Sequence, residues 1–537
     1  TSFFYTTVIL AFVGGLAIGS YIVKGPLKRG KDPLKLLARV QIGIGCTTLL
    51  LFVLFILTAP LFHAFQESQS AWFATVGLEQ FYIFLVITPP VVLMGFTFPL
   101  VSVIYNHAEG NIGKDIGSLG ALDTVGSVAG SVVAAFVLIP LLGTVRSFLA
   151  VVMINLLLGT WLLQFRKNGI MMKRLAGVLV VAIVGLVALL PANTVWINKQ
   201  WNTVLEDKVI YYREGPSASV GVTEFRNRNA ALSINGAITA YTLLNDVQVH
   251  KMLGVLPWIF TEEPGDALVV GLGIGITAKT LDMAGVPDIS VAEISPEVAY
   301  VCENIFGTLY FQADSSPAIF IEDGRAHLYR SEKTYDLITT NAIHPRLGNG
   351  IYTSDFYAMC ADRMSPDGIM CQWIPTNWLS EEEYKTLLRS FTAVFPCASL
   401  WVINDAHTIV LGSGKPFRYD LEKIMARLRE PAINEYLERS LYINSADVLK
   451  HFWLDNAALK DYIGPGELNT DNRPVIEFSK VVSRAPNLDV LTSFAGNQVR
   501  VGELFETGHD RMNVLNAIES RQQELANRLG VYIEQID

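Results

Sequence analysis

Residues 267–293 read ALVVGLGIGITAKTLDMAGVPDISVAE, and this stretch decides the fold class. Two short apolar runs, ALVV and ISVA, enclose a segment with helical periodicity. The first run ends directly in three alternating glycines, Gly271, Gly273 and Gly275. The order of strand, glycine turn, helix and strand is that of a unit in which two parallel strands are joined by a crossover helix. We therefore predict an α/β domain here.

The same alternation continues on both sides of this stretch. The further strand candidates are PAIFIEDG, YDLITTN, GIMCQWI and ASLWVI, with helical segments between them. We predict a largely parallel, doubly wound sheet with helices on both faces, in which ligands bind at the carboxyl ends of the strands. A small antiparallel β unit is expected before it. The domain boundaries we expect are 206–250 for the β unit, 251–415 for the α/β domain and 416–537 for a C-terminal helical extension.

Three predicted strand ends carry residues suited to ligand binding. The glycine loop allows a tight turn and a close backbone approach, and the helix after it offers free N–H groups. Glu293 ends the next strand, where an acid is well placed to accept both hydroxyls of a ribose. Asp323-Gly324 follows the third strand, and Asp323 could accept a hydrogen bond from an adenine amine. The alternatives are a packing turn for the glycines and a helix N-cap for Asp323.

The N-terminal part of the chain is too apolar for an ordinary soluble protein. The whole chain is 51% hydrophobic and 17% charged, with a mean hydropathy of +0.36. The apolar excess lies before about residue 192, where six runs are long enough to cross a bilayer. Thr1 opens the chain and an apolar run follows at once, so we expect that some sequence upstream is missing. The six runs lie near 3–23, 36–60, 80–105, 117–142, 147–165 and 175–192.

Loop charges predict the orientation of these spans. Eleven Lys and Arg residues lie in the first, third and fifth loops, and one, Arg146, lies in the even loops. Basic loops stay in the cytoplasm, so a bacterial inner-membrane protein with its α/β domain on the periplasmic side is expected. Asp123 lies inside the fourth run, where an acid indicates either a functional site or a residue bonded near a helix end.

Several classes of protein are disfavoured. No basic tract is long enough for nucleic acid, and the five cysteines form no CxxC pair that would predict a metal site. The glycine loop is not G-x-x-x-x-G-K-[ST], and neither G-x-S-x-G nor HExxH occurs. We expect no metal and no tightly bound cofactor.

These motifs, in this order, resemble the spermidine synthase (polyamine aminopropyltransferase) family, which has the class I methyltransferase-like, Rossmann-like fold. The resemblance covers residues from about 206 to 415 and includes LSINGAIT, DVQVHKML and LGNGIYTSDFY. The apolar half resembles a membrane-linked variant of that family, and NTDNRPVIEF (469–478) looks like a marker of the same subgroup. The helices of that variant normally begin one span earlier, so the resemblance implies a further span upstream. The resemblance implies an S-adenosylmethionine-type nucleoside as substrate and aminopropyl transfer to an amine as the reaction.

The acceptor side departs from the family pattern. In spermidine synthases the fourth strand ends in an Asp. A second Asp follows three residues later, and a Pro comes directly after it. Here those two positions are Asn341 and His344. The first Asp is thought to orient and deprotonate the amine, and an amide cannot accept that proton at neutral pH. His344 could be an alternative base, or it could bond a backbone carbonyl and cap the loop.

Two further positions differ. The family's Tyr-His pair is Val249-His250 here, and its Asp-Gly strand is Asn235-Gly236. The residues expected to bind the nucleoside match the family pattern, whereas those expected to bind the amine differ from it. The resemblance therefore predicts catalytic candidates Asn341, His344 and His250 with a degenerate base.

Two other functions remain open. One is a non-catalytic membrane subunit that acts as the scaffold of a larger assembly, and the other is a transferase with a different acceptor. Homo- or hetero-oligomers through the membrane helices are possible partners in either case.

Overall fold

The computed structural model describes residues 2–68, 72–105, 112–164, 208–307, 317–341, 343–440, 442, 445–479, 488–495, 497–503 and 512–536. The chain divides into two compact units. The first is Thr1–Glu206 with Tyr212–Ser219, and the second is Asp207–Tyr211 with Val220–Asp537.

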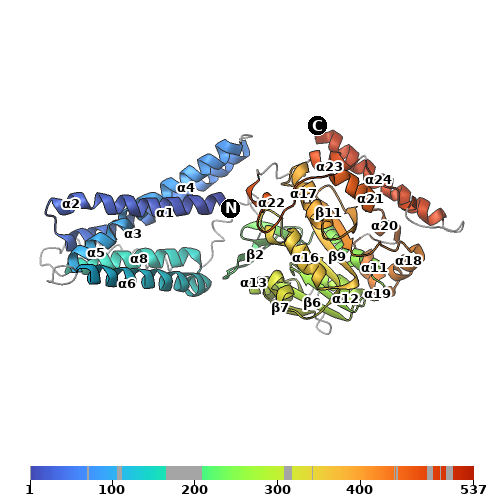
Figure 1. Cartoon of the computed structure of the whole chain (residues 1–537), viewed down its shortest axis with the longest axis horizontal. Helices are drawn as coiled ribbons and strands as arrows, with labels where there is room; N and C mark the ends of the chain where they lie inside the picture. Colours follow the sequence, from blue (N-terminus) through green and yellow to red (C-terminus); the bar gives the residue numbers. More distant parts are fainter. Residues whose placement is uncertain are drawn as a thin grey trace. The chain divides into compact units, whose positions relative to one another are not determined.

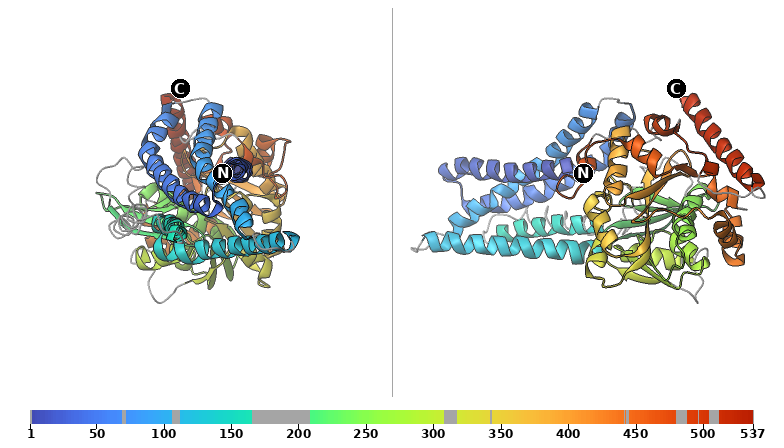
Figure 2. Two further views of the ribbon diagram at one scale, coloured as in Figure 1. Left: turned by 90° about the vertical axis from the view of Figure 1, so that its left-hand side faces the viewer. Right: turned by 45° about the vertical axis from the view of Figure 1, so that its right-hand side comes forward.

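The first unit is helical, as the apolar runs predict, and its helices lie side by side (Figures 1 and 2). Five of its segments are long and apolar enough to cross a membrane: Phe4–Lys28, Pro33–Phe55, Gly77–Tyr105, Gly113–Leu142 and Thr144–Leu163. They match five of the six predicted spans, and the sixth, 175–192, lies outside the described residues. The helices are α1 (Ser2–Ile22), α2 (Lys24–Lys28), α3 (Pro33–Ser68), α4 (Trp72–Gly95), α5 (Thr97–Tyr105), α6 (Ile112–Val133), the π-helical η1 (Ala134–Leu138), α7 (Ile139–Leu142) and α8 (Thr144–Gln164).

Glycines set the closest crossing in this unit. A Cβ atom on Gly19 of α1 would lie 2.0 Å from the carbonyl oxygen of Val92 on α4, and one on Gly95 would lie 2.5 Å from that of Leu16. Ser20 donates a hydrogen bond of 2.9 Å to the Gly95 carbonyl. Small residues allow this backbone contact, which is how apolar helices associate where no hydrophobic effect drives them together.

A small four-stranded sheet precedes the large one, as predicted. Its strands are β1 (Lys208–Glu214), β2 (Ser219–Glu224), β3 (Ala230–Ile234) and β4 (Ala237–Tyr241), in sequential order. Asn235 and Gly236 join β3 to β4 with φ of +51° and +80°. A two-residue hairpin turn with both φ values positive favours Asn-Gly, so the change from the family's Asp-Gly keeps the turn.

The large sheet has the order β12-β10-β11-β9-β8-β5-β6-β7. Strands β5 to β9 pair in parallel, and β9–β11, β11–β10 and β10–β12 pair antiparallel. The largely parallel half is as predicted, whereas β11 and β12 were not predicted as strands. The strands are β5 (Asp266–Val270), β6 (Asp288–Glu293), β7 (Ala318–Ile321), β8 (Tyr335–Thr340), β9 (Met364–Pro375), β10 (Cys397–Val402), β11 (His407–Ser413) and β12 (Phe452–Leu454).

The helices of the α/β domain alternate with the strands and pack around the sheet (Figure 1). Helix α11 extends through the predicted boundary at 250/251, so it joins the β unit to the α/β domain. Helix α16 begins after Thr353, whose hydroxyl accepts the N–H of Phe356 at 3.2 Å. The helices are α11 (Leu244–Phe260), α12 (Ile276–Met283), α13 (Pro296–Asn304), α15 (Gly324–Arg330), the 3-10 turn η2 (Asn349–Ile351), α16 (Ser354–Asp362) and α17 (Glu381–Thr392).

The C-terminal extension shares the core of the α/β domain. It contributes the strand β12 as well as helices, and Trp453, Ile463 and Phe494 are buried in one cluster with residues of β5, β8 and β9. The extension is therefore an integral layer of the domain. Its helical segments are α18 (Leu421–Leu428), α19 (Pro431–Glu438), α20 (Ser445–Leu449), α21 (Asn456–Ile463), α22 (Val475–Phe478), α23 (Leu488–Ala495), η3 (Val501–Glu503) and α24 (Met512–Ile536).

Candidate functional site

The glycine loop forms a tight turn at the carboxyl end of β5. Gly271, Gly273 and Gly275 have φ of +88°, +56° and +85°, a region that side chains with a Cβ rarely adopt. The Gly271 N–H bonds the Ala292 carbonyl at 2.9 Å, which ties the loop to β6. Helix α12 starts at the next residue, Ile276. The three glycines thus bring bare backbone to the edge of the sheet where ligands of such folds bind.

Glu293 ends β6 and holds the glycine loop. One carboxylate oxygen accepts the N–H of Leu272 at 2.9 Å, and the other accepts the N–H of Ser295 at 2.9 Å. The side chain is 6% exposed, and this burial raises the pKa of the carboxyl group while the backbone N–H bonds oppose the rise. The backbone N–H groups of Gly273 and Ile294 also bond the carboxylate. The group is therefore oriented by the backbone at the carboxyl end of β6, beside the glycine loop.

Asp323 and Gly324 lie where β7 passes into α15. An oxygen of Asp323 accepts the N–H groups of Arg325 and Ala326, both at 3.0 Å, which is the N-cap arrangement. A Cβ on Gly324 would lie 2.5 Å from Val270, so a glycine is needed for α15 to start against β5. The side chain of Asp323 is exposed, and its contact with an adenine amine stays a prediction.

Sequence reasoning missed Ile294, which follows Glu293 directly. Its side chain is 56% exposed at the carboxyl end of β6. Ligand pockets are lined mostly by apolar side chains with a few polar groups among them, so an exposed isoleucine beside a buried acid is a feature of such a site. The signal in the sequence was a large aliphatic residue immediately after the strand-terminal acid.

Asn341 and His250 meet beside the glycine loop. A Cβ on Gly273 would lie 3.2 Å from the amide nitrogen of Asn341, and the Asn341 side chain bonds His250 of α11. Burial lowers the pKa of His250 to about 4 in spite of that bond. Its Nδ1 has no hydrogen-bond partner within the described part of the chain. The site therefore contains a neutral imidazole with an open nitrogen.

Two side chains from the antiparallel part of the sheet join this group. Trp373 of β9 donates its indole N–H to Nδ1 of His407 at the start of β11, at 3.1 Å. Burial and the nearby His250 lower the pKa of His407 to about 4. Neither residue was predicted, because β11 was not predicted and the contact spans 34 positions. We call Asn341, His250, Trp373 and His407 the uncharged wall.

His344 forms its hydrogen bonds with residues outside the uncharged wall. Its Nε2 bonds the carbonyl of Asn377 at 3.0 Å, and its Nδ1 accepts the N–H of Arg346 at 3.2 Å. Burial lowers its pKa to about 4, and the ring lies 4.8 Å from that of Trp378. Both nitrogens are used within the loop, so a role as base would require the ring to leave these partners. That role stays a prediction.

The match to a known family covers this site. Residues 246–404 match the spermine/spermidine synthase domain, from the first turn of α11 to the end of β10. The chain carries a spermine/spermidine synthase domain. The matched range includes the glycine loop, Glu293, Asp323, Asn341 and His250.

Known relatives of the synthase domain are polyamine aminopropyltransferases. The enzyme of Aquifex aeolicus named polyamine aminopropyltransferase 2 is 21% identical over 66% of this chain and 74% of its own length. That of Oceanobacillus iheyensis is 22% identical over 62% and 66%. Polyamine aminopropyltransferase 2 of Pseudomonas aeruginosa is 26% identical over 35% of this chain and 56% of its own length.

Two solved structures are also similar. Spermidine synthase from Thermotoga maritima covers 44% of this chain and 87% of its own, at 18% identity and a TM-score of 0.35. A probable spermidine synthase from Corynebacterium glutamicum covers 49% and 97%, at 15% identity and a TM-score of 0.37.

In the synthase domain a strongly anchored loop follows β8. Arg346 forms a buried ion pair with Glu383 of α17, with contacts of 2.8 and 2.9 Å to its two oxygens. A second set of bonds comes from the segment NTDNRPVIEF. Asn469 donates to the Asn349 side chain and the Tyr352 carbonyl, both at 2.9 Å. This segment, which the resemblance marked without a role, therefore braces the loop beside Asn341.

Asp471 extends the same brace to α15. It accepts the Thr353 hydroxyl at 2.8 Å and pairs with Arg325, which also donates to the Gly350 carbonyl at 2.8 Å. Because Arg325 lies two residues after Asp323, the brace links the loop after β8 to the helix start after β7. Two strand ends of the synthase domain are thus held at a set spacing.

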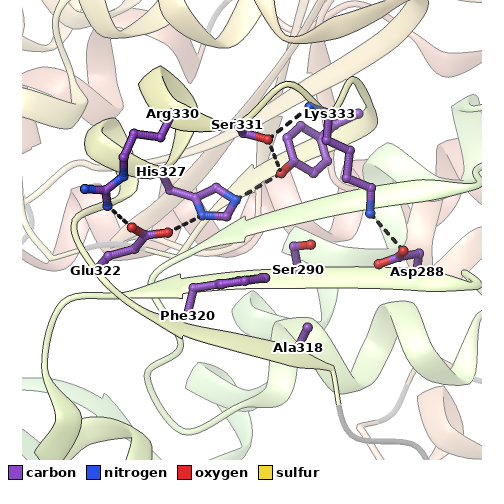
Figure 3. Close-up of a pocket in the computed structure, with 10 residues that line it drawn as sticks. Asp288, Ser290, Ala318, Phe320, Glu322, His327, Arg330, Ser331 and Lys333 are labelled. Carbon is purple, nitrogen blue, oxygen red and sulfur yellow. Dashed lines mark hydrogen bonds and ion pairs between the residues drawn. The ribbon is translucent and has the colours of Figure 1, made fainter.

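One cavity of about 430 Å³ lies elsewhere, beside β6, β7 and α15 (Figure 3). None of the predicted site residues lines it. His327 bonds Glu322 at 2.6 Å through Nδ1 and Tyr335 at 3.0 Å through Nε2, while Lys333 pairs with Asp288 at 2.8 Å. These polar groups satisfy one another, so their arrangement serves the fold of the synthase domain.

Proposed function

We propose that this protein is an integral membrane, spermidine synthase-like transferase. Its synthase domain would bind decarboxylated S-adenosylmethionine and pass the aminopropyl group to an amine. The observation that carries the proposal is the buried Glu293 carboxylate, which backbone N–H bonds hold in a fixed orientation beside the glycine loop at the carboxyl end of β6.

The nucleoside side has a role for each residue. Glu293 would accept the two ribose hydroxyls, and Ile294 would pack against the adenine ring. Asp323 would accept a hydrogen bond from the adenine amine. The glycines would let the chain between sugar and sulfonium pass close to the backbone. Charge-assisted hydrogen bonds of this kind contribute about 1.5–3 kcal/mol each.

The transfer step needs a deprotonated amine. Its nitrogen lone pair attacks the propyl carbon on the sulfonium, the C–S bond breaks, and methylthioadenosine leaves with the bonding electrons. The amine proton must then pass to a base. Nδ1 of His250 is the better candidate, since that nitrogen is unbonded whereas both nitrogens of His344 are engaged. With a pKa lowered to about 4, His250 is a weak base, so slow turnover is expected.

The apolar N-terminal half supports a location of the protein in a membrane. The five apolar helices support insertion into a bacterial inner membrane, and the loop charges favour a periplasmic synthase domain. Sulfonium nucleosides are made in the cytoplasm, so a periplasmic site would need a supply across the membrane. The helices could also join copies of this chain or a partner subunit.

A non-catalytic subunit is the second candidate function. It is favoured by the amide at Asn341, where the resemblance implies a carboxylate, and by the engaged ring of His344. A different acceptor is the other option, since the uncharged wall suits a nucleophile with less positive charge than a polyamine.

Nucleoside binding separates these candidates. The full chain in detergent would be titrated by calorimetry with S-adenosylmethionine, its decarboxylated form and methylthioadenosine. We expect binding of at least one, and a loss of tenfold or more for Glu293→Ala. Glu303→Ala removes an exposed carboxylate of α13 and should bind like the wild type. If the wild type binds none of the three, the transferase function is wrong and the non-catalytic subunit is favoured.

A further inference from the structure

Arg325 joins three parts of the synthase domain at the start of α15. Its Nη1 donates to the Gly350 carbonyl and to one oxygen of Asp471, both at 2.8 Å. Its Nη2 pairs with the second oxygen of Asp471. A guanidinium and a carboxylate that meet through two parallel bonds fix each other's orientation as well as their distance. The pair therefore sets where the first turn of α15 lies.

Helix α15 depends on this outside contact. It has seven residues, Gly324–Arg330, and so short a helix forms too few internal hydrogen bonds to be stable alone. Its N-cap is Asp323, for which we propose a contact with the adenine amine, and Arg325 lies two positions further on. The contacts of Arg325 therefore hold the turn that presents Asp323.

Asp471 is itself held by the segments around it. Its carboxylate accepts the Thr353 hydroxyl at 2.8 Å, and its own N–H donates to the Asp355 carboxylate at 2.8 Å. Two residues earlier, the Asn469 carbonyl accepts the N–H of Ser354 at 2.9 Å. Backbone and side-chain bonds thus fix this segment to the start of α16. Asp471 presents its carboxylate to α15 from an anchored position.

The strands that these contacts connect flank the predicted nucleoside site. In the sheet order β8-β5-β6-β7, β5 ends in the glycine loop and β6 ends in Glu293. Thr353 belongs to the segment after β8, and Arg325 belongs to the helix after β7. The Arg325–Asp471 pair therefore links the chain on either side of the two strand ends that carry the glycines and Glu293.

The pair is placed for a role other than stabilising the fold. The side chains of Arg325 and Asp471 are 27% and 38% exposed, and ion pairs at such exposure contribute little to stability. Asp471 also lies beyond residue 404, where the match to the spermine/spermidine synthase domain ends. Its effect on the position of the neighbouring turn can therefore exceed its effect on stability.

We propose that Asp471 is a positioning residue for the nucleoside, which acts through Arg325 on the turn at Asp323. The inference rests on the proposed nucleoside binding and adds that the C-terminal extension completes the site. With Arg325 held, the Asp323 carboxylate stays in one place relative to the glycine loop, and the adenine amine meets an oriented acceptor. Preorganisation of this kind raises affinity, because less order has to be imposed when the ligand binds.

Affinity and stability measured on the same variants test the inference. The full chain in detergent would be titrated with methylthioadenosine by calorimetry, and thermal melting would be followed in parallel. Asp471→Asn keeps an oxygen for the Thr353 hydroxyl but loses the charge and the second oxygen that Arg325 needs. We expect binding to weaken about fivefold or more, while the melting temperature stays close to that of the wild type.

Further variants separate positioning from a general loss of charge. Asp471→Glu keeps the carboxylate and should retain most of the affinity. Arg325→Gln breaks the same link from the other side, so Arg325→Gln and Asp471→Asn together should weaken binding by less than the product of their separate effects. Glu467→Gln is the matched control, because it removes an exposed carboxylate of the same segment that pairs with Arg473 at 2.8 Å, and no change in affinity is expected.

The outcomes are distinct. If the wild type binds methylthioadenosine and Asp471→Asn binds it equally well, the inference is wrong and the proposed function stands. The inference is also overturned if affinity falls only together with a large drop in melting temperature, or if Glu467→Gln weakens binding as much. Arg325→Gln provides the same comparison should Asp471→Asn not fold. If the wild type binds no methylthioadenosine, the proposed function is wrong and the inference fails with it.

Discussion

Asn341→Asp should raise aminopropyl transfer to 1,4-diaminobutane by about 10²-fold. Losing or gaining a general base typically changes a rate by about 10²–10⁴, and the low end is expected because Val249 stands where the family has a tyrosine. The new carboxylate would bond His250, whose pKa burial lowers from 6.5 to about 4. That shift corresponds to about 3 kcal/mol.

The new pair can offset this cost. Opposite charges about 4 Å apart attract by about 4 kcal/mol at an effective dielectric constant near 20. The pKa of His250 should therefore return toward its ordinary value. The carboxylate and the imidazole would together accept the proton of the amine. Because the proton-accepting imidazole is populated only above that pKa, the ratio of variant to wild-type rates should rise as pH increases through it.

The assay is release of methylthioadenosine from decarboxylated S-adenosylmethionine, followed by chromatography between pH 5 and 9. Asn304→Asp adds the same charge on the exposed face of α13 and is the matched control. The reasoning is refuted if Asn341→Asp folds and binds methylthioadenosine but transfers no faster than the wild type. It is also refuted if the wild type already matches the variant, since the amide would then be no defect.

Three further results are expected. In the folded protein, burial raises the pKa of Asp246 in the first turn of α11 from 3.8 to about 6. Between these values the folded state binds more protons than the unfolded state, so stability falls as pH rises through this window. In chemical denaturation, Asp246→Asn should be more stable than the wild type by about 1–3 kcal/mol at pH 8 and equal to it at pH 3. Asn469→Ala removes the two hydrogen bonds that its side chain donates and should lower the free energy of unfolding by about 1–3 kcal/mol and speed proteolysis within 343–352; unchanged cleavage would show that the brace does not hold the loop. A reporter fused after residue 537 should be active in the periplasm only, and cytoplasmic activity would overturn the orientation drawn from the loop charges.

Local patterns predicted the nucleoside side of the site. Glycines at alternate positions after an apolar run force a turn at that place, and Glu293 terminates the next run, so both were visible without tertiary information. Thr353 as a helix cap was predictable for the same reason. These features depend on residues within one strand–turn–helix unit.

The acceptor side depended on contacts between distant segments. His407 meets Trp373 across 34 positions, and His344 meets Asn377 across 33, so neither pairing is marked by a local pattern. Strand β12 has three residues, too few for an alternating pattern, and its state is set by pairing with β10.

Strand β12 has a consequence for shortened versions of the protein. It pairs with Leu400 and Trp401 of β10, whose outer side would otherwise be an unpaired sheet edge. Unprotected edges invite pairing with other chains and aggregation. A version that stops at residue 415, the predicted end of the α/β domain, would leave the outer edge of β10 without β12 and remove Trp453 from the core. We expect such a version to be insoluble, whereas one that starts near 208 and continues to residue 536 keeps every strand of the sheet paired as in the full chain.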